Sequence, residues 1–357
     1  MNRNSNRPTN IDIVEVGGAG GVYQHSVALS VALKELGLTV RLHTASNPEF
    51  TDARVDTMAC FDWFRSAGRR RQILIVWYFS VATLPRVFRL RGRVWIQGSF
   101  KPFLTLLMIA GIRVRGRRVM FSPHTLFTRH GGSTDQFFLD LCVRLSSTVV
   151  VYNSADFDLL SRRRRQAVIA PLLMYTPVVS SEAANHWRQR IRGMGISVCS
   201  IGQIRTDKNL PMLVHAAYAA GTPLLIAGAD AGGVAELRKV MMDFPDSACV
   251  LIEEYLAVED LAAIAAITGS VALPYSVASS SGVAVLAKAY GARILAYGVG
   301  DLASQADVVV QSLNEDDWAS ALRANCAVSR NEQIPLPQAA SAAELNQLLK
   351  LVQGESI

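Results

Sequence analysis

Short apolar runs alternate with longer stretches of helix-like sequence along the whole chain. In the first half, such runs predict strands at residues 11–16, 39–44, 72–77, 93–97, 118–122 and 148–152. Apolar runs of this length without polar alternation are typical of parallel strands that are covered on both faces. Residues 22–36 separate the first two runs and have the length and composition of a helix, which Gly37 ends.

The second half repeats the same alternation. It predicts strands at residues 198–201, 224–226, 249–251, 270–273, 293–296 and 308–310, and two closing helices at 315–326 and 341–352. Prolines at 171 and 177 with polar residues after them indicate a linker at 176–195. We therefore expect an α/β fold with two Rossmann-like, doubly wound domains that face a central cleft. These would be residues 1–175 and 196–335, and a C-terminal helix at 336–357 would pack back on the first domain.

One strand of the second half runs into a loop of small, hydroxyl-bearing residues and then into a helix. The strand ends at Leu273, and Ser280, Ser281, Gly282 and Val283 lead into the helix. The first N–H groups of a helix lack internal partners and carry partial positive charge, so this pattern predicts a phosphate site. An ordinary β–α turn of a Rossmann-like sheet has the same local pattern and stays open as the alternative.

A second loop carries two cations after a strand. Gly202 ends the strand at 198–201, and Arg205 and Lys208 follow before a helix that begins near Leu210. Ligands of open α/β sheets bind at the carboxyl ends of the strands, and a lysine with an arginine suits a diphosphate. Two solvated loop cations are the alternative.

Composition and charge narrow the class of protein. Half of the 357 residues are hydrophobic, but no apolar run reaches the roughly 20 residues that a membrane helix needs. The five scattered cysteines fit a reducing cytoplasm, and the N-terminal segment lacks the apolar core of a signal peptide. Residues 1–180 hold 24 Lys and Arg against 11 Asp and Glu, a net of +13, while the remainder, with 12 against 18, has −6.

The basic first half suggests an anionic partner. The chain shows no aromatic-basic RNA-binding signature, zinc finger or helix-turn-helix, so we expect no nucleic acid. Basic and apolar residues alternate at 86–118, which suits an anionic membrane surface, although a core helix with solvated ends would look the same. We expect a cytoplasmic protein, peripheral on the inner face of the membrane.

Several segments, taken in order, resemble the GT-B glycosyltransferases, in particular the bacterial polysaccharide-type enzymes of glycosyl transferase group 1. They are GGAGGVYQHSVALSVAL from residue 17, FSPHTLFTRH from 121, VVVYNSADFDLL from 149, GQIRTDKNLPMLVHA from 202, IAGAD from 226 and LPYSVASSSG from 273. The resemblance implies a hexosyltransferase that uses a nucleotide-diphosphate sugar, such as GDP-mannose or a UDP-hexose, as co-substrate without a further cofactor. It also implies a glycan or lipid-linked oligosaccharide acceptor in surface polysaccharide biosynthesis.

The chain departs from the retaining relatives at two kinds of position. In those enzymes one glutamate serves the sugar face of the donor and a second serves the nucleotide ribose. This sequence has Ala278 and Leu286 at the two positions. The retaining relatives also open the cation loop with Gly-Arg, whereas Gln203 follows Gly202 here, so Arg205 would take over that role and Lys208 fits the pattern. A subset of polysaccharide glycosyltransferases shares this form, and the outcome at the anomeric carbon stays open.

Glycosyl transfer needs charge stabilisation on the departing diphosphate and a base for the acceptor. Arg205, Lys208 and the helix start at Gly282 supply the first without a metal. His124, just after a strand of the acceptor-side domain, is the candidate general base, with an ordinary histidine pKa near 6.5; a structural histidine in a turn is the alternative. Further candidates on the acceptor side are His25, Asp135 and Asp140.

The glycine loop near the start is the last candidate element. Gly20 and Gly21 would allow close approach to the donor phosphate, but the loop lacks a clear G-x-G-x-x-G and an acidic residue after the second strand, which argues against NAD. A nucleotide-sugar epimerase and a non-catalytic partner protein of the same fold are the competing functions. We find no acid/base set for an epimerase, whereas the missing glutamates leave a non-catalytic partner open as an alternative to the glycosyltransferase.

Overall fold

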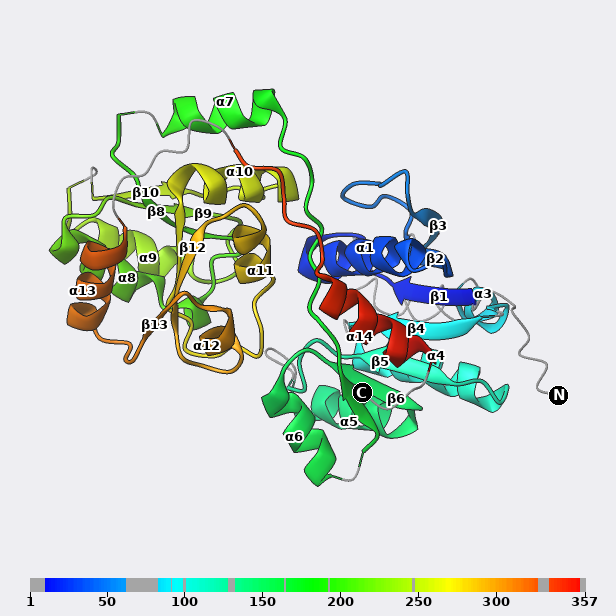
Figure 1. The fold of residues 1–357 in the computed structure, drawn as a ribbon. Coiled ribbons are helices and arrows are strands. Elements are labelled where there is room, and N and C mark those ends of the chain that lie inside the picture. Colours follow the sequence, from blue (N-terminus) through cyan, green and yellow to red (C-terminus); the bar gives the residue numbers. More distant parts are fainter. Residues whose placement is uncertain are drawn as a thin grey trace, which may run out of the picture. The chain divides into compact units, whose positions relative to one another are not determined.

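The chain folds into two compact units. The computed structural model describes residues 10–61, 83–90, 92–98, 101–127, 132–163, 165–191, 193–245, 248–326 and 334–353. The first unit combines Met1–Met174 with Ala340–Ile357, and the second is Tyr175–Ala339 (Figure 1). The C-terminal segment therefore belongs to the same unit as the N-terminal half of the chain.

The first unit is built on a seven-stranded parallel sheet with the order β3-β2-β1-β4-β5-β6-β7. Its buried strand residues, such as Ile13, Leu42 and Trp95, are almost completely excluded from solvent because helices cover both faces. The strands are β1 (Asn10–Glu15), β2 (Thr39–Ala45), β3 (Asp56–Phe61), β4 (Arg93–Gln97), β5 (Val119–Ser122), β6 (Thr148–Val151) and β7 (Ala167–Ile169).

Helices connect these strands and one returns from the end of the chain. They are α1 (Gly20–Glu35), α3 (Leu84–Phe88), α4 (Pro102–Val114), α5 (Ser133–Leu145), α6 (Ser154–Arg162) and α14 (Ala342–Gln353). Helix α14 lies against α1 (Figure 1). Its Gln347 side chain donates to the backbone carbonyl of Ile169 at 2.9 Å. The strand expected at 72–77 lies outside the described residues, and β3 and β7 were not expected.

The second unit repeats the plan on a six-stranded parallel sheet with the order β10-β9-β8-β11-β12-β13. The second sheet thus has the doubly wound order 3-2-1-4-5-6, and the first has the same order with a seventh strand added at one edge. This confirms the fold class expected from the sequence. The strands are β8 (Val198–Ile201), β9 (Leu224–Ala227), β10 (Cys249–Ile252), β11 (Ser270–Leu273), β12 (Arg293–Tyr297) and β13 (Val308–Val310). The helices are η3 (Thr206–Lys208), α8 (Leu210–Ala220), α9 (Val234–Met241), α10 (Val258–Thr268), α11 (Gly282–Ala289), α12 (Leu302–Gln305) and α13 (Glu315–Asn325).

The segment expected to be a linker contains a helix instead. Helix α7 (Ser181–Arg190) begins after Ser180, whose hydroxyl accepts from the Ala183 N–H at 3.1 Å. Helix α7 lies beside α10 (Figure 1). Trp187 is fully buried, and its indole N–H donates to Asp260 Oδ1 of α10 at 2.7 Å. One buried tryptophan therefore docks an otherwise polar helix on the second unit.

Candidate functional site

The two phosphate-binding candidates of the sequence follow adjacent strands of the second sheet. Strands β8 and β11 pair at the centre of the sheet, where the order of the strands reverses. Ligands of doubly wound sheets bind at this reversal, outside the carboxyl ends of the strands. The cation loop follows β8, and the serine-glycine loop follows β11, so the sheet topology brings both to one place.

Lys208 is buried within this group. It is only 5% exposed, its Nζ donates to the Ile201 carbonyl at 3.2 Å, and the amine lies 5.1 Å from the centre of the Tyr275 ring. A Cβ added to Gly202, which has φ +89°, would lie 3.4 Å from Lys208 Nζ and 3.5 Å from Val283 Cγ2. Gly202 therefore lies close to both Lys208 and Val283, and a side chain at this position would contact both.

The start of α11 is capped and braced. The Ser281 hydroxyl accepts from the Ala284 N–H at 3.3 Å, while the Ser281 N–H donates to Gln305 Oε1 at 3.0 Å. This leaves the Gly282 and Val283 N–H groups as first-turn donors, which by helix geometry have no intrahelical acceptor. Ser280 lies half-buried in the same loop.

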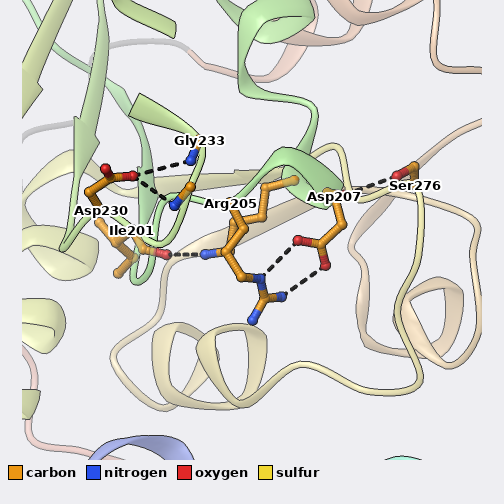
Figure 2. A network of polar contacts seen from close by, with 8 residues as sticks. Ile201, Arg205, Asp207, Asp230, Gly233 and Ser276 are labelled. Atoms are coloured by element: carbon orange, nitrogen blue, oxygen red, sulfur yellow. Dashed lines mark hydrogen bonds and ion pairs between the residues drawn. The ribbon is translucent and has the colours of Figure 1, made fainter. Parts of the chain in front are cut away.

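Arg205 is held by a neighbour that the sequence reading did not single out. Its Nε and one terminal nitrogen donate to the two carboxylate oxygens of Asp207 at 2.8 and 3.0 Å, as Figure 2 shows. The Asp207 carbonyl in turn accepts from the backbone N–H of Ser276 at 2.9 Å and from its hydroxyl at 3.1 Å. Asp207 therefore ties the cation loop to the loop after β11 and occupies part of the arginine fork.

Asp230, in the IAGAD segment, accepts hydrogen bonds from the backbone with its carboxylate. Its Oδ1 accepts from the N–H groups of Gly232, Gly233 and Val234 at 2.9, 3.1 and 3.2 Å (Figure 2). These hydrogen bonds to the ionised form lower the pKa of the Asp230 carboxyl. The carboxylate therefore caps the start of α9.

In the first unit, His124 belongs to a cluster of polar side chains from three strand ends and α1. Its Nε2 lies 2.9 Å from Gln97 Oε1, and its ring stacks on that of Tyr152 at 4.9 Å between centres. The Tyr152 hydroxyl lies 2.9 Å from His25 Nε2 and 3.2 Å from Gln97 Oε1. Because an amide oxygen only accepts, the hydrogen bond to Gln97 places the His124 proton on Nε2 and the ring's lone pair on Nδ1.

Both histidines are neutral in this environment. Burial, and then the nearby His25, hold the pKa of His124 well below 6.5, which corrects the ordinary value assumed from the sequence. Burial lowers the pKa of His25 to about 4, although a hydrogen bond to the Leu173 carbonyl at 2.7 Å opposes this shift. Both ring nitrogens of His25 are hydrogen-bonded, and the residue is 1% exposed. His25 therefore positions the Tyr152 hydroxyl.

His124 and Gln97 carry two further marks of a functional position. His124 has φ +60°, a left-handed conformation that is uncommon for residues other than glycine and that clusters at functional sites. Gln97 is 3% exposed, and its Nε2 is buried without a hydrogen-bond partner among the described residues. Polar residues at the end of an apolar strand were the available signal for Gln97, and it was missed.

The glycine loop after β1 is closed by carboxylates of the chain itself. Gly17 and Gly18 donate their N–H groups to the two oxygens of Glu15, each at 2.8 Å, and Gly20 donates to Glu49 Oε2 at 2.9 Å. A Cβ at Gly18, with φ +64°, would lie 2.6 Å from the Ala45 Cβ, so this turn requires glycine. Gly21 follows in the first turn of α1.

Two further acceptor-side candidates lie on α5, and the two positions of the missing glutamates lie in the second unit. Asp135 is in the first turn of α5, and Asp140, on the same helix, contacts Gln136 at 3.1 Å and Arg163 at 3.9 Å. Leu286 is 1% exposed in the hydrophobic interior, so a glutamate there would need a buried partner, whereas Ala278 is half-buried in the loop after β11.

The chain contains one Asp-x-Asp spacing, Asp156-Phe157-Asp158, in the first turns of α6. Asn153 accepts from the Asp156 N–H at 2.7 Å and donates to its carboxylate at 2.8 Å. This reciprocal pair caps the helix and explains the acidic residue at that position.

Comparisons with known proteins agree on the fold. No protein-family model and no curated protein sequence matches the chain. Among solved structures, sucrose-phosphate synthase from Thermosynechococcus elongatus is similar over 96% of this chain and 95% of its own, with 16% identity and a TM-score of 0.67. The catalytic domain of starch synthase IV from Arabidopsis thaliana, bound to ADP and acarbose, is similar over 97% of this chain and 95% of its own, with 13% identity and a TM-score of 0.70.

HepE from Anabaena, in complex with UDP, is similar over 88% of this chain and 89% of its own, with 12% identity and a TM-score of 0.63. The chain therefore has the GT-B fold of these glycosyltransferases, as the sequence resemblance implied.

Proposed function

We propose that this protein is a metal-independent hexosyltransferase that takes its sugar from a nucleotide-diphosphate sugar such as GDP-mannose or a UDP-hexose. The observation that carries the proposal is the meeting of Lys208, Gly202 and the start of α11 at the strand reversal of the second sheet. An amine beside the first turn of a helix suits a diphosphate. The UDP and ADP bound by the similar structures HepE and starch synthase IV support this assignment.

The donor side would act by stabilising the leaving diphosphate. As the glycosidic bond breaks, negative charge grows on the phosphate oxygens, and a charge that is fixed before the reaction lowers the barrier without reorganisation. Lys208 meets this requirement because its burial and its contacts with Ile201 and Tyr275 fix the position of the amine. Arg205 would contribute the part of its fork that Asp207 leaves available.

The acceptor side would use His124 as the general base. The neutral imidazole, positioned by Gln97, would take the proton from an acceptor hydroxyl. The buried Gln97 Nε2 is a donor that a hydroxyl of the acceptor would satisfy. We propose a glycan or lipid-linked oligosaccharide of surface polysaccharide biosynthesis as this acceptor, on the sequence resemblance.

The donor site is tested by nucleotide binding to Lys208→Met, which keeps the length of the side chain but removes its charge. Charge-assisted hydrogen bonds are worth roughly 1.5–3 kcal/mol, so affinity for UDP, GDP or ADP in calorimetry should fall about tenfold to a hundredfold. Lys239→Met, an exposed lysine on α9, is the control and should bind as the wild type does. Equal affinity in a folded Lys208→Met protein would remove Lys208 from the donor site.

A non-catalytic partner protein is the second candidate, because Ala278 and Leu286 stand where retaining relatives carry glutamates. Such a protein would bind the nucleotide at Lys208 but release no nucleotide diphosphate from any sugar donor. Incubation with a panel of nucleotide sugars and mass spectrometry of the products separates the two functions: released diphosphate supports the transferase, and binding without release supports the partner.

We place this activity in the cytoplasm, at the inner face of the membrane. Among the described helices, none is long and apolar enough to cross a bilayer. Peripheral attachment to anionic lipid would bring a lipid-linked acceptor within reach, and the net charge of +13 on residues 1–180 supports it.

A further inference from the structure

The loop after β11 has a neighbour on each side. In the second sheet β11 lies between β8 and β12, and the three strands are parallel. The segments that follow β8 and β12 therefore flank the serine-glycine loop, here residues 276–282, at the same end of the sheet. The cation loop follows β8, and residues 300–305, which we call the support segment, follow β12 and contain α12.

The first contact of the support segment is between backbones. The Asp301 N–H donates to the Ser279 carbonyl at 2.9 Å. Gly300 has φ +58°, and a Cβ added to it would overlap the Ala278 carbonyl oxygen and lie 3.1 Å from that of Ser279. Glycine is the residue that combines this left-handed conformation with so close an approach. The missing side chain at Gly300 therefore sets how near the two segments lie.

The second contact is made by the side chain of Gln305. Its Oε1 accepts from the Ser281 N–H at 3.0 Å, one residue before α11 begins. Ser281 is 5% exposed, and its hydroxyl accepts from the Ala284 N–H at 3.3 Å, so the loop joins the helix at a residue that is bonded on both sides. Gln305 is itself fixed, because its N–H donates to the Asp301 carbonyl at 3.2 Å and Leu302 of the same helix is completely buried.

The beginning of the serine-glycine loop is fixed from the cation loop. The Asp207 carbonyl accepts from both the N–H and the hydroxyl of Ser276 (Figure 2). Residues 276–280 are exposed or half-buried, and Val277 is 60% exposed. The loop therefore keeps its position through contacts with its two neighbours rather than through burial of its own side chains.

We propose that Gly300 and Gln305 are positioning residues of the donor site, an inference that rests on the function proposed above. The two residues hold the serine-glycine loop and the first turn of α11 where the N–H groups of Gly282 and Val283 meet the diphosphate. Groups that are in place before the ligand arrives lose little further freedom on binding, which preserves affinity. A loop without this support would have to be ordered by the ligand and would bind it more weakly.

A pair of glycine variants tests the backbone contact. Gly300→Ala should displace the serine-glycine loop, remove at least one hydrogen bond to the diphosphate and weaken binding about tenfold or more. Gly221→Ala is the control, because it introduces similar left-handed strain, at φ +66°, with nothing within 4 Å of the added Cβ, and it should bind as the wild type does. Calorimetry measures both with whichever of UDP, GDP and ADP the wild type binds best. Wild-type affinity in a folded Gly300→Ala protein would overturn the role of Gly300.

A pair of glutamine variants tests the side-chain contact and decides the matter if Gly300→Ala fails to fold. Gln305→Leu should weaken binding about threefold to tenfold, because the Ser281 N–H loses its acceptor. Gln189→Leu, the same change at an exposed glutamine of α7, should bind as the wild type does.

Two partial ligands distinguish positioning from general damage to the unit. Inorganic pyrophosphate should lose the same factor of affinity in Gln305→Leu as the nucleotide does, whereas the nucleoside alone, followed by ligand-observed NMR, should bind the variant and the wild type equally. A general disturbance would weaken the nucleoside as well. An equal loss for the nucleoside, or wild-type affinity for the nucleotide, would overturn the role of Gln305.

Lys208→Met, measured alongside, separates this inference from the donor site on which it rests. Weaker binding by Lys208→Met, together with wild-type binding by Gly300→Ala and Gln305→Leu, overturns the inference and leaves the donor site in place. If the wild type binds none of the three nucleotides, or if Lys208→Met binds as the wild type does, the donor site fails and the inference fails with it.

Discussion

At the scale of single residues, the state of each polar group depends on neighbours that are distant in sequence. His43 is held as an imidazolium by Asp12, 31 residues away, while His124 is held neutral by burial and by His25. Both have the same pKa in an unfolded chain, near 6.5. The sequence placed His124 correctly after a strand, but it could not give the sign of either shift, because burial and partners arise only in the folded state.

Gln97 offers a direct test of how His124 is positioned. Replacement of the amide by a carboxylate in Gln97→Glu puts a negative charge next to the His124 Nε2 proton, which favours the imidazolium. The His124 pKa, followed by its imidazole proton signals in an NMR titration, should rise by at least about one unit. If the protein is a transferase, the acid limb of its turnover should move to higher pH by the same amount.

The matched control is Gln338→Glu, an exposed glutamine of the second unit that receives the same change of charge. It should leave the His124 titration where it is in the wild type. An unchanged His124 pKa in a folded Gln97→Glu protein would show that the amide does not govern this imidazole.

At the scale of elements, the sequence predicted the buried strands well and the partly exposed ones poorly. The four-residue strands β8, β9 and β11 are completely buried, and apart from one serine each in β8 and β11 they are apolar. Strands β3 and β7 lie at the sheet edges and keep exposed or half-buried positions; β3 begins with two polar residues, and β7 has only three residues. Helix α7 was read as a linker because only Ala184 and Trp187 are buried among its ten residues.

The contact between two loops of the second unit leads to a prediction about Asp207. Its carboxylate neutralises Arg205, while its carbonyl, which a side-chain change leaves in place, binds Ser276. Asp207→Asn should release the arginine fork and strengthen nucleotide-diphosphate binding by about threefold to tenfold, a gain of up to roughly 1.4 kcal/mol. Calorimetry with the best-binding nucleotide measures the change.

Asp243→Asn is the control for this prediction, since it removes the same charge from an exposed position after α9. It should bind the nucleotide as the wild type does. Weaker binding by Asp207→Asn would mean that the Asp207 carboxylate orients Arg205 for the ligand rather than competing with it.

At the scale of the whole molecule, strand order decides which loops meet. The βα alternation was readable from the sequence, but the order of the strands in each sheet was not, because strand pairing depends on contacts between distant segments. That order places the loops after β8 and β11 side by side, and likewise those after β1 and β4. Gln97, Asp207 and Gln305 were missed for the same reason: their partners are fixed by topology.

Strand direction also bears on the proposed attachment to a membrane. Arg93 and Arg118 lie at the amino-terminal ends of β4 and β5, whereas Gln97 and His124 lie at the carboxyl-terminal ends. These arginines of the basic block at 86–118 and the candidate acceptor site therefore lie at opposite ends of the same two strands. Among the described residues, five arginines of the block donate to backbone carbonyls, namely Arg86, Arg93, Arg113, Arg115 and Arg117. Much of the apolar side of α4 is buried in the core rather than available to lipid.

Exposed aromatic residues lie on the side of the candidate acceptor site, near the carboxyl-terminal ends of β4 and β5. Phe103 begins α4, Phe127 follows β5 and Phe137 is in α5, with exposures of 40, 62 and 58%. Phe138 packs against both Phe103 and Phe137, with ring centres 5.1 and 5.6 Å apart. Aromatic side chains at this edge suit the interfacial layer of a bilayer that holds a lipid-linked acceptor.

The basic residues of the first half and the exposed aromatic residues both predict recruitment to vesicles that contain anionic lipid. The two contributions should respond differently to salt. Recruitment in a flotation assay should fall as NaCl rises, because exposed charges are screened over about 8 Å at physiological ionic strength. The double variant Phe127→Ser, Phe137→Ser should bind less than the wild type at every salt concentration, because insertion of apolar rings is not screened. Tyr218→Ser, an exposed aromatic of the second unit, is the control. Equal recruitment by neutral and anionic vesicles would contradict the electrostatic part, and unchanged binding of the double variant would contradict the aromatic part.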